Sequence, residues 1–234
     1  MKKQEIIEMA NKVVTDDVFT SFVATFECND MIIVSILCAW LQNTYDDTFW
    51  VVEKIVHERM QDSPTAYILK YKGIESVVGS LYKNISERNY DCLMFAINRI
   101  TLLQGGIRNT FDNYMQSPRH KCKYAHDAFA LMFGSNTCFP NINNKGTFFR
   151  YNLILYWLVF KFKLWRDIDN DFLLLPCNDY LFETACKFGI TKNVMKSTLT
   201  NTIKLTDIAK QWFGKKDFWK MYEFLTFYKV ANDE

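Results

Sequence analysis

The sequence predicts an all-α protein, a compact set of many short helices around a buried core. Hydrophobic residues make up 49% of the 234 residues and aromatic residues 16%, enough apolar volume to fill a sizeable interior. The chain has only eight Gly and four Pro, which are few for a fold rich in turns. No stretch shows the period-2 alternation of a half-buried strand. Long runs of helix joined by short loops account for all three observations.

Capping residues and apolar spacing place the first helices. The opening residues have the mixed charged and apolar spacing of an amphipathic helix, without the continuous apolar core of a signal peptide. Asp30 is expected to cap one helix and Asp46 or Asp47 the next. Pro64 fits the first turn of another, where its missing N–H is not needed. The expected spans are 1–14, 31–41, 48–59 and a short helix from 63, with 74–87 compatible with a helix weakened at Gly79.

The later helices are bounded mainly by glycine and proline. Apolar residues recur at helical spacing from Asn89, and Gly105-Gly106 is expected to end that helix. Pro118 ends the following helix, and Gly134 ends the one after it. The expected spans are 89–103, 108–115, 120–133, 147–162, 179–188, 193–213 and 217–230, with a loop at 135–146 and a connector at 164–176.

Two segments are apolar enough to suggest a membrane. Met31–Leu41 stops after about eleven residues, and Tyr151–Phe160 is interrupted by Asn152 and bounded by charged residues. Because a spanning helix needs about 20 apolar residues, both segments are expected to be buried inside the protein. The sequence therefore predicts no membrane association.

Cysteine usage points to a reducing compartment. The seven cysteines are odd in number, form no C-x-x-C pair and in several cases lie within apolar stretches. Buried free thiols and a cytoplasmic location are the simplest interpretation. The spacing needed for an iron–sulfur cluster is absent, and only three histidines are available for a zinc site. No cofactor and no metal are expected.

Charge is distributed unevenly along a chain whose net charge is +2. Residues 1–118 contain 11 Lys and Arg against 15 Asp and Glu, whereas residues 119–229 contain 17 against 9. A basic second half can neutralise phosphates, although a solvated lysine face is an equally simple explanation. Residues 1–234 are expected to form one helical domain, in which two lobes can be present and the basic part covers about 119–230.

The segment Phe139–Thr147 resembles the hairpin of helix-hairpin-helix DNA glycosylases, written L-P-G-h-G-x-K-T-A, where h is apolar. Asn141 and Asn143 stand at the glycine positions, and Asn tolerates positive φ better than other non-glycine residues. The resemblance implies a bend whose main-chain amides contact a DNA phosphate. The implied DNA-binding residues are Asn141, Asn143, Asn144, Lys145 and Gly146.

A second segment, LPCNDY followed by a helix ending in KFGI, resembles the glycosylase pattern L-P-x-D-T-H-h-x-R-h-A-x-K-L-G-h. In that superfamily the aspartate supports cleavage of the glycosidic bond, and here Asn178 takes its place. The resemblance gives Asn178, the neighbouring Asp179 and Lys145 as the catalytic candidates. The structural interpretation is a helix N-cap at Asn178 followed by an acidic first turn.

Over nearly its whole length the chain resembles an uncharacterised bacterial family within the same HhH-GPD base-excision glycosylase superfamily. That family has C-K-R-L-N-M-F-L-R-W before the buried helix. Aligning Arg150, Asn152 and Trp157 puts Phe149 at the lysine of this pattern, whereas aligning on the hairpin makes Lys145 the counterpart. The matching runs are NDMIIVSILCAW, SPTAYILK, DCLMFAINRITLLQGGIRNTF, RYNLILYWLV, LWRDID, LLLPCNDYLFETACKFGI and LTDIAKQWFGKKDFWKMYEF.

Two functions are compatible with these residues. The first is a DNA-binding protein with a two-lobed, glycosylase-like helical fold that holds duplex or damaged DNA, with weak or lost catalysis because an amide cannot supply the charge of a carboxylate. The alternative is a non-catalytic helical module with a protein-interaction or structural role. The altered hairpin glycines, Asn178 and Phe149 favour this alternative.

Overall fold

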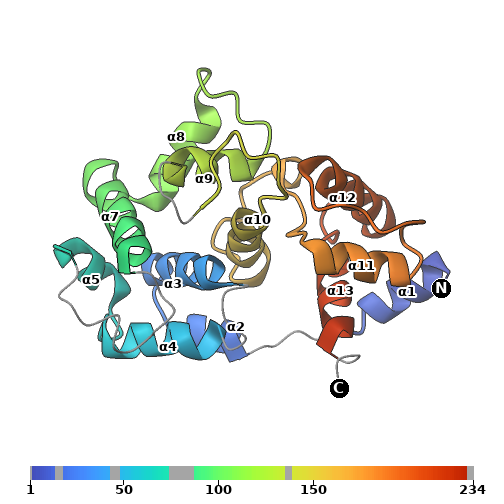
Figure 1. Cartoon of the computed structure of the whole chain (residues 1–234), viewed down its shortest axis with the longest axis horizontal. Coiled ribbons are helices and arrows are strands. Elements are labelled where there is room, and N and C mark those ends of the chain that lie inside the picture. Colours follow the sequence, from blue (N-terminus) through green and yellow to red (C-terminus); the bar gives the residue numbers. More distant parts are fainter. Residues whose placement is uncertain (1, 14–17, 43–47, 74–86, 135–138, 231–234) are drawn as a thin grey trace. The chain divides into compact units, whose positions relative to one another are not determined.

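The computed structural model describes residues 2–13, 18–42, 48–73, 87–134 and 139–230. These residues form twelve α-helices, one π-helix and one 3-10 helix, with no strand among them (Figure 1). The prediction of an all-α protein is confirmed. None of the helices in the described ranges has the length and apolar composition needed to cross a membrane.

The chain divides into two compact units, which are described separately below. Unit 1 contains residues 1–20 and 144–234, and unit 2 contains residues 21–143. The short helix α2 (Val18–Val23) spans the first junction between them. The second junction falls within the bend 139–147, between Asn143 and Asn144. The basic part of the sequence, which begins near residue 119, is therefore shared by both units.

Unit 2 is built around α3, in which every residue from 32 to 41 is buried. The expectation that this apolar run lies inside the protein is confirmed, and α3 contacts both α4 and α5. Besides α3, the helices that the structure describes wholly within this unit are α4, α5, α7, α8 and α9. Their bounds are α3 (Cys28–Leu41), α4 (Thr48–Glu58), α5 (Pro64–Lys70), α7 (Glu87–Leu103), α8 (Ile107–Gln116) and α9 (Ala125–Phe133).

Asp30 does not cap α3, contrary to the expectation from sequence. The helix begins at Cys28 with Glu27 at its N-cap, so Asp30 already lies in the first turn. Its carboxylate accepts a hydrogen bond from the main-chain amide of Thr65 at 2.6 Å and another from the Thr65 hydroxyl. The aspartate thus joins α3 to the start of α5, a long-range role that local spacing does not reveal. Asp46, Asp47 and residues 74–86 lie outside the described residues.

The boundaries of α7 and α8 follow the prediction, and that of α9 does not. Gly105 and Gly106 have φ of 75° and 98°, a conformation that favours glycine and ends α7. α9 begins at Ala125 instead of near residue 120, because the Asp127 carboxylate accepts hydrogen bonds from the amides of Lys123 and Tyr124, both at 2.8 Å. This capping box fixes the start of the helix.

Unit 1 has a buried centre formed by α10 and the π-helix η1, where residues 151–159 are all buried. One continuous α-helix was expected over 147–162. Instead the α-helical pattern ends at Tyr156, and η1 follows it. The elements of this unit are α1 (Lys3–Ala10), α10 (Phe149–Tyr156), η1 (Trp157–Lys161), the 3-10 helix η2 (Asn170–Phe172), α11 (Asp179–Lys187), α12 (Leu199–Phe213) and α13 (Lys220–Val230).

A buried charged group ties η1 to α13. The carboxylate of Glu223 accepts a hydrogen bond from the Tyr156 hydroxyl at 2.6 Å and pairs with the Lys161 ammonium at 2.7 Å. Glu223 is only 5% exposed, so this pair replaces the water that the carboxylate loses on folding.

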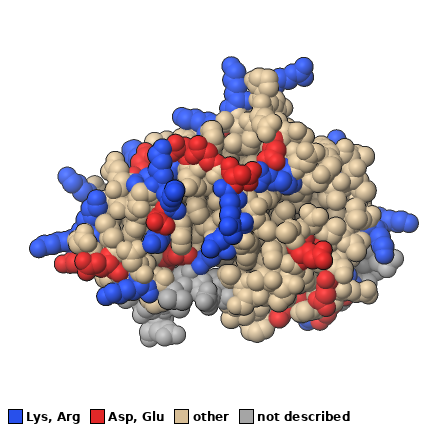
Figure 2. Space-filling view, turned by 180° about the vertical axis from the view of Figure 1, so that it is seen from behind, with Lys and Arg blue, Asp and Glu red and all other residues tan. Residues whose placement is uncertain are grey.

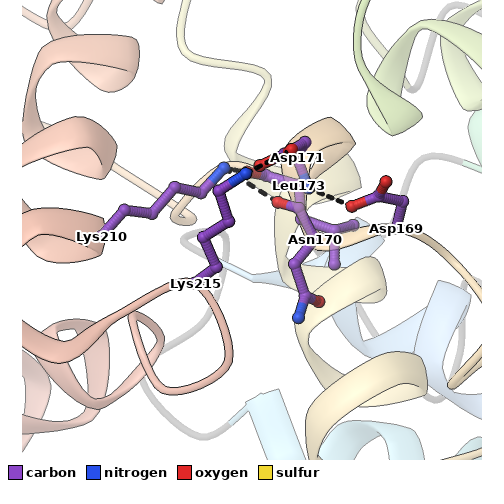
Figure 3. Close-up of polar contacts among 6 residues, drawn as sticks. All are labelled: Asp169, Asn170, Asp171, Leu173, Lys210 and Lys215. Carbon is purple, nitrogen blue, oxygen red and sulfur yellow. Dashed lines mark hydrogen bonds and ion pairs between the residues drawn. The ribbon is translucent and has the colours of Figure 1, made fainter.

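Polar side chains of α12 hold the segment that leads to α11 (Figure 3). The Lys210 ammonium donates hydrogen bonds to the carbonyls of Asn170 at 2.8 Å and Leu173 at 3.1 Å. Next to it, Lys215 pairs with Asp171 at 2.6 Å. One turn earlier on α12, the Thr206 hydroxyl accepts a hydrogen bond from the Leu175 amide at 3.0 Å. The path of the chain up to Asn178 is therefore set by α12.

Candidate functional site

The first part of the predicted bend belongs to unit 2. Phe139 is buried, and its ring centroid lies 5.7 Å from that of Phe133 at the end of α9. Asn141 and Asn143 are exposed, and the amide of Asn143 donates a hydrogen bond to the side-chain oxygen of Asn141 at 3.0 Å. Neither asparagine has a positive φ, so the expected left-handed backbone is wrong. The side chain of Asn141 forms the turn instead, as short polar residues often do.

The second part of the bend belongs to unit 1. Asn144 and Lys145 are exposed, and the amide of Gly146 donates a hydrogen bond to the Asn144 side chain at 2.7 Å. Thr147 is buried, and its main-chain carbonyl accepts a hydrogen bond from the buried side-chain amide of Asn152 at 3.1 Å. Asn152 is therefore a structural hydrogen-bonding residue. It fixes the end of the bend to the first turns of α10.

Asn178 acts as the N-cap of α11. Its side-chain oxygen accepts a hydrogen bond from the Leu181 amide at 2.9 Å, which occupies the group that the glycosylase pattern assigns to catalysis. The next residue, Asp179, is exposed, and its carboxylate accepts a hydrogen bond from the Ser197 hydroxyl. The charged group that projects from the start of α11 is thus that of Asp179.

The residues that enter α12 connect Asp179 with Lys145. The amide of Leu199, the first residue of α12, donates a hydrogen bond to the Lys145 carbonyl at 3.3 Å. Ser197, which contacts Asp179, precedes Leu199 by two residues. Within unit 1 the structure therefore brings together two residues from separate motifs, an exposed carboxylate and the lysine-bearing part of the bend.

Sequence reasoning missed Ser197 and the neighbouring Lys196. The predicted helix began near residue 193, which would have placed both residues inside its first turns. In the structure Thr198 is the N-cap, with its hydroxyl accepting from the Asn201 amide at 3.3 Å. Ser-Thr before a helical pattern is a recognised start signal and could have identified this entry loop.

Basic residues surround this entry loop in the sequence, and the side chains of Lys145, Lys192 and Lys196 are exposed. In the part of the chain that the structure describes, neither Lys145 nor Lys196 forms an ion pair. On the face shown in Figure 2, Lys and Arg side chains form several separate groups with Asp and Glu between them. No continuous basic surface is seen on this face.

The alternative position for the lysine of the family pattern is occupied by Phe149. This residue is the first of α10 and is partly buried. A phenyl ring can neither bind phosphate nor act as a nucleophile. Of these two residues, only Lys145 has a side chain suited to either role. Among the described residues, no group of three or more His, Cys, Asp or Glu side chains is arranged to hold a metal ion.

A protein-family model described as "Protein of unknown function (DUF2400)" matches residues 20–225, which is most of the chain. The chain belongs to this family. The description of the family assigns no activity and no ligand, so the glycosylase resemblance stays a prediction. No significant match was found among curated proteins or among solved structures.

The chemistry available at the entry to α12 follows from two charged groups. The exposed ammonium of Lys145 can contact a phosphate oxygen, and the carboxylate of Asp179 can stabilise positive charge that develops on a sugar. The Ser197 hydroxyl, which donates to Asp179, holds the carboxylate in place. Asn178 lacks the charge needed for the second role.

Proposed function

We propose that this protein binds duplex or damaged DNA through unit 1, with Asn144, Lys145 and Gly146 on the phosphate backbone. The observation that carries the proposal is the shared contact of Lys145 and Asp179 with the loop that enters α12. In the glycosylases that the sequence resembles, a hairpin and a carboxylate belong to the same site. Asp179 would then take the position that the sequence pattern gives to Asn178.

The proposal gives the lysines near this loop a direct role. Each lysine that neutralises a phosphate releases counterions, so DNA affinity should fall as salt concentration rises. Lys145 and Lys196 are exposed and adjoin the start of α12, where the main-chain carbonyls of both accept hydrogen bonds. They are therefore the first residues to test.

The binding experiment measures fluorescence anisotropy of duplexes with and without an abasic site across a range of salt concentrations. The Lys145→Gln and Lys196→Gln variants should each reduce the salt slope by about 0.9. Lys216→Gln is the matched control, because Lys216 is exposed and follows the opposite end of α12, about 20 Å away for a helix of this length. Wild-type binding that does not respond to salt would contradict the proposal.

Catalysis requires a separate experiment, since binding can persist without it. Asp179→Asn keeps a hydrogen-bond acceptor for Ser197 and removes the charge. If base excision is detected in the wild type, this variant should lower its rate by about a hundredfold or more, with DNA affinity unchanged. The reciprocal Asn178→Asp variant places a carboxylate at the position of the family pattern and keeps a good helix N-cap.

Two observations favour the alternative, a non-catalytic helical module. The amides of Asn143 and Gly146 already donate to asparagine side chains, so they are not available to a phosphate without rearrangement. Asn178 is likewise occupied as a helix cap. This alternative predicts that the Lys145 and Lys196 variants behave like the wild type towards every duplex. Their salt dependence therefore separates the two functions.

A further inference from the structure

A cavity of about 610 Å³ lies in unit 2. It is lined by the end of α4, the turn from α4 to α5, the exposed side of α5, the residues that follow α5 and Tyr90 of α7. This volume is within the range of about 300–1,000 Å³ that small-molecule sites occupy. The helices that surround it are held together by the contacts of α5 with α3 and α7.

Three tyrosines form one wall of the cavity. Tyr67 and Tyr71 lie on the α5 side, with ring centroids 5.5 Å apart, and the ring of Tyr90 packs edge-on against Tyr71 at 6.3 Å. Tyr90 is almost fully buried, whereas Tyr67 and Tyr71 are partly exposed. The wall is therefore rigid at its base and open to a ligand at its edge.

The hydroxyl groups of this wall are not equivalent. Tyr71 donates its hydroxyl hydrogen to the carboxylate of Asp91, and Tyr90 donates to the oxygen of Tyr67 at 3.3 Å. The hydrogen of the Tyr67 hydroxyl has no acceptor among the described residues. Burial raises the pKa of Tyr67, although the hydrogen bond from Tyr90 and the positive charge of Arg59 act in the opposite direction. Tyr67 therefore remains a hydrogen-bond donor at neutral pH.

The charge of the lining is mainly positive. Arg59, Lys70 and Lys72 contribute basic groups from three different segments, and Glu58 contributes the one acidic group of the lining. Glu58 is paired with Lys54 on the outside of α4 at 3.8 Å. Lys70 and Lys72 are exposed, so their ammonium groups can reach a ligand without crossing the core.

We propose that this cavity binds a small aromatic phosphate ester, of the size and chemistry of a nucleoside monophosphate. A phosphate monoester offers several acceptor oxygens to the guanidinium, the two ammonium groups and the Tyr67 hydroxyl. Its planar ring would lie against the tyrosines and the neighbouring apolar side chains of Met60 and Ala66. A bare phosphate ion would leave most of the cavity empty. The site is independent of the proposed DNA contact.

Isothermal titration calorimetry of the full chain tests the proposal with adenosine monophosphate, adenosine and inorganic phosphate as probes. The monophosphate should bind at least about tenfold more tightly than either of the other two, because it alone has both a ring to pack against the tyrosines and a phosphate to bind the basic groups. Tyr67→Phe keeps the ring and removes the hydroxyl, and it should weaken binding by about tenfold. The double variant Lys70→Gln/Lys72→Gln should weaken binding by about tenfold and reduce its salt dependence.

Lys121→Gln is the matched control, because Lys121 is an exposed lysine of the same unit that does not line the cavity. It should bind the monophosphate within about twofold of the wild type. The exposed lysine variants keep the test valid if Tyr67→Phe fails to fold, which circular dichroism would detect. No binding of the monophosphate, or equal affinity for adenosine or for inorganic phosphate, would overturn the proposal. Lys145→Gln should leave this binding unchanged, which separates it from the DNA experiment.

Discussion

At the scale of single residues, Glu223 of unit 1 carries a buried carboxylate, and burying a charge is costly unless partners compensate for the lost water. It is satisfied by Tyr156 from α10 and Lys161 from η1, so its partners come from two consecutive helical elements. A buried charge that loses its counter-ion is far more costly than one replaced together with its partner. The two partners should therefore differ in their effect when removed.

Lys161→Met should lower the free energy of unfolding by about 3 kcal/mol, because it removes the ammonium that pairs with the buried carboxylate of Glu223. Tyr156→Phe removes one hydrogen bond and should cost about 1.5 kcal/mol. Urea unfolding followed by circular dichroism measures both. A double variant, Lys161→Met with Glu223→Gln, should recover part of the loss. A smaller effect for Lys161→Met than for Tyr156→Phe would show that the pair is not what holds the carboxylate.

The exposed pair of Asp171 and Lys215 behaves differently. The hydrogen bond from Lys215 lowers the pKa of Asp171 below its ordinary value. Any stability from this pair is present above the ordinary aspartate pKa and is lost as pH falls through the lowered one. Lys215→Gln should move the pKa of Asp171 back towards its ordinary value in an NMR titration. An unchanged titration curve would show that the two side chains do not pair in solution.

At the scale of elements, the sequence predicted the existence of most helices and misplaced several of their starts. The continuous apolar run of α3 and the apolar spacing of α7 gave their positions, since burial of this kind is encoded locally. The starts of α9 and α12 lie about five residues later than predicted, because Asp127 and Thr198 cap them. The short helix α2 was not predicted at all. The start of a helix depends on which of several nearby polar side chains accepts hydrogen bonds from its first main-chain amides. The spacing of apolar residues alone does not determine which one does.

The candidate site shows the same limit. Asn178 was correctly seen as a helix cap, but its neighbour Asp179 contacts Ser197, 18 residues further on. That contact depends on how α12 lies along the segment before α11, which no local pattern contains. The expected positive φ at Asn141 and Asn143 also failed, because an asparagine side chain can close a turn without it.

The polar residues of α12 make a prediction about this arrangement. Thr206→Val removes the acceptor for the buried amide of Leu175 and should lower the free energy of unfolding by about 2 kcal/mol. Thr200→Val, on an exposed position of the same helix, is the control and should change stability by less than about 0.5 kcal/mol. Chemical denaturation of both variants provides the comparison. Equal stabilities would mean that the Leu175 amide finds another acceptor.

At the scale of the whole molecule, the described cysteines differ in how far they are exposed to solvent. The six described cysteines are free thiols, which confirms that expectation for these positions, but their burial varies. Cys38 and Cys177 are buried, and burial raises the pKa of the Cys177 thiol. Cys28 is exposed, so the expectation of burial is wrong there.

A thiol reagent should therefore label the native protein in a fixed order. Cys28 should react in the native protein, whereas Cys38 and Cys177 should react only when the protein unfolds, because both are buried and closed to the reagent. Mass spectrometry after labelling with and without denaturant identifies the positions. Rapid native labelling of Cys177 would mean that the packing between α12 and the residues before α11 opens readily.

The π-helix η1 has a consequence for how this chain tolerates change in length. Its wide turn holds one residue more than an ordinary helical turn, as the hydrogen bond from the Phe162 amide to the Trp157 carbonyl at 2.8 Å shows. Deleting a single residue from this turn would restore regular α-helical winding and leave the chain on either side of the turn in nearly the same orientation. The wide turn of η1 is therefore the place where this helix should lose one residue with the least effect on the elements at its two ends.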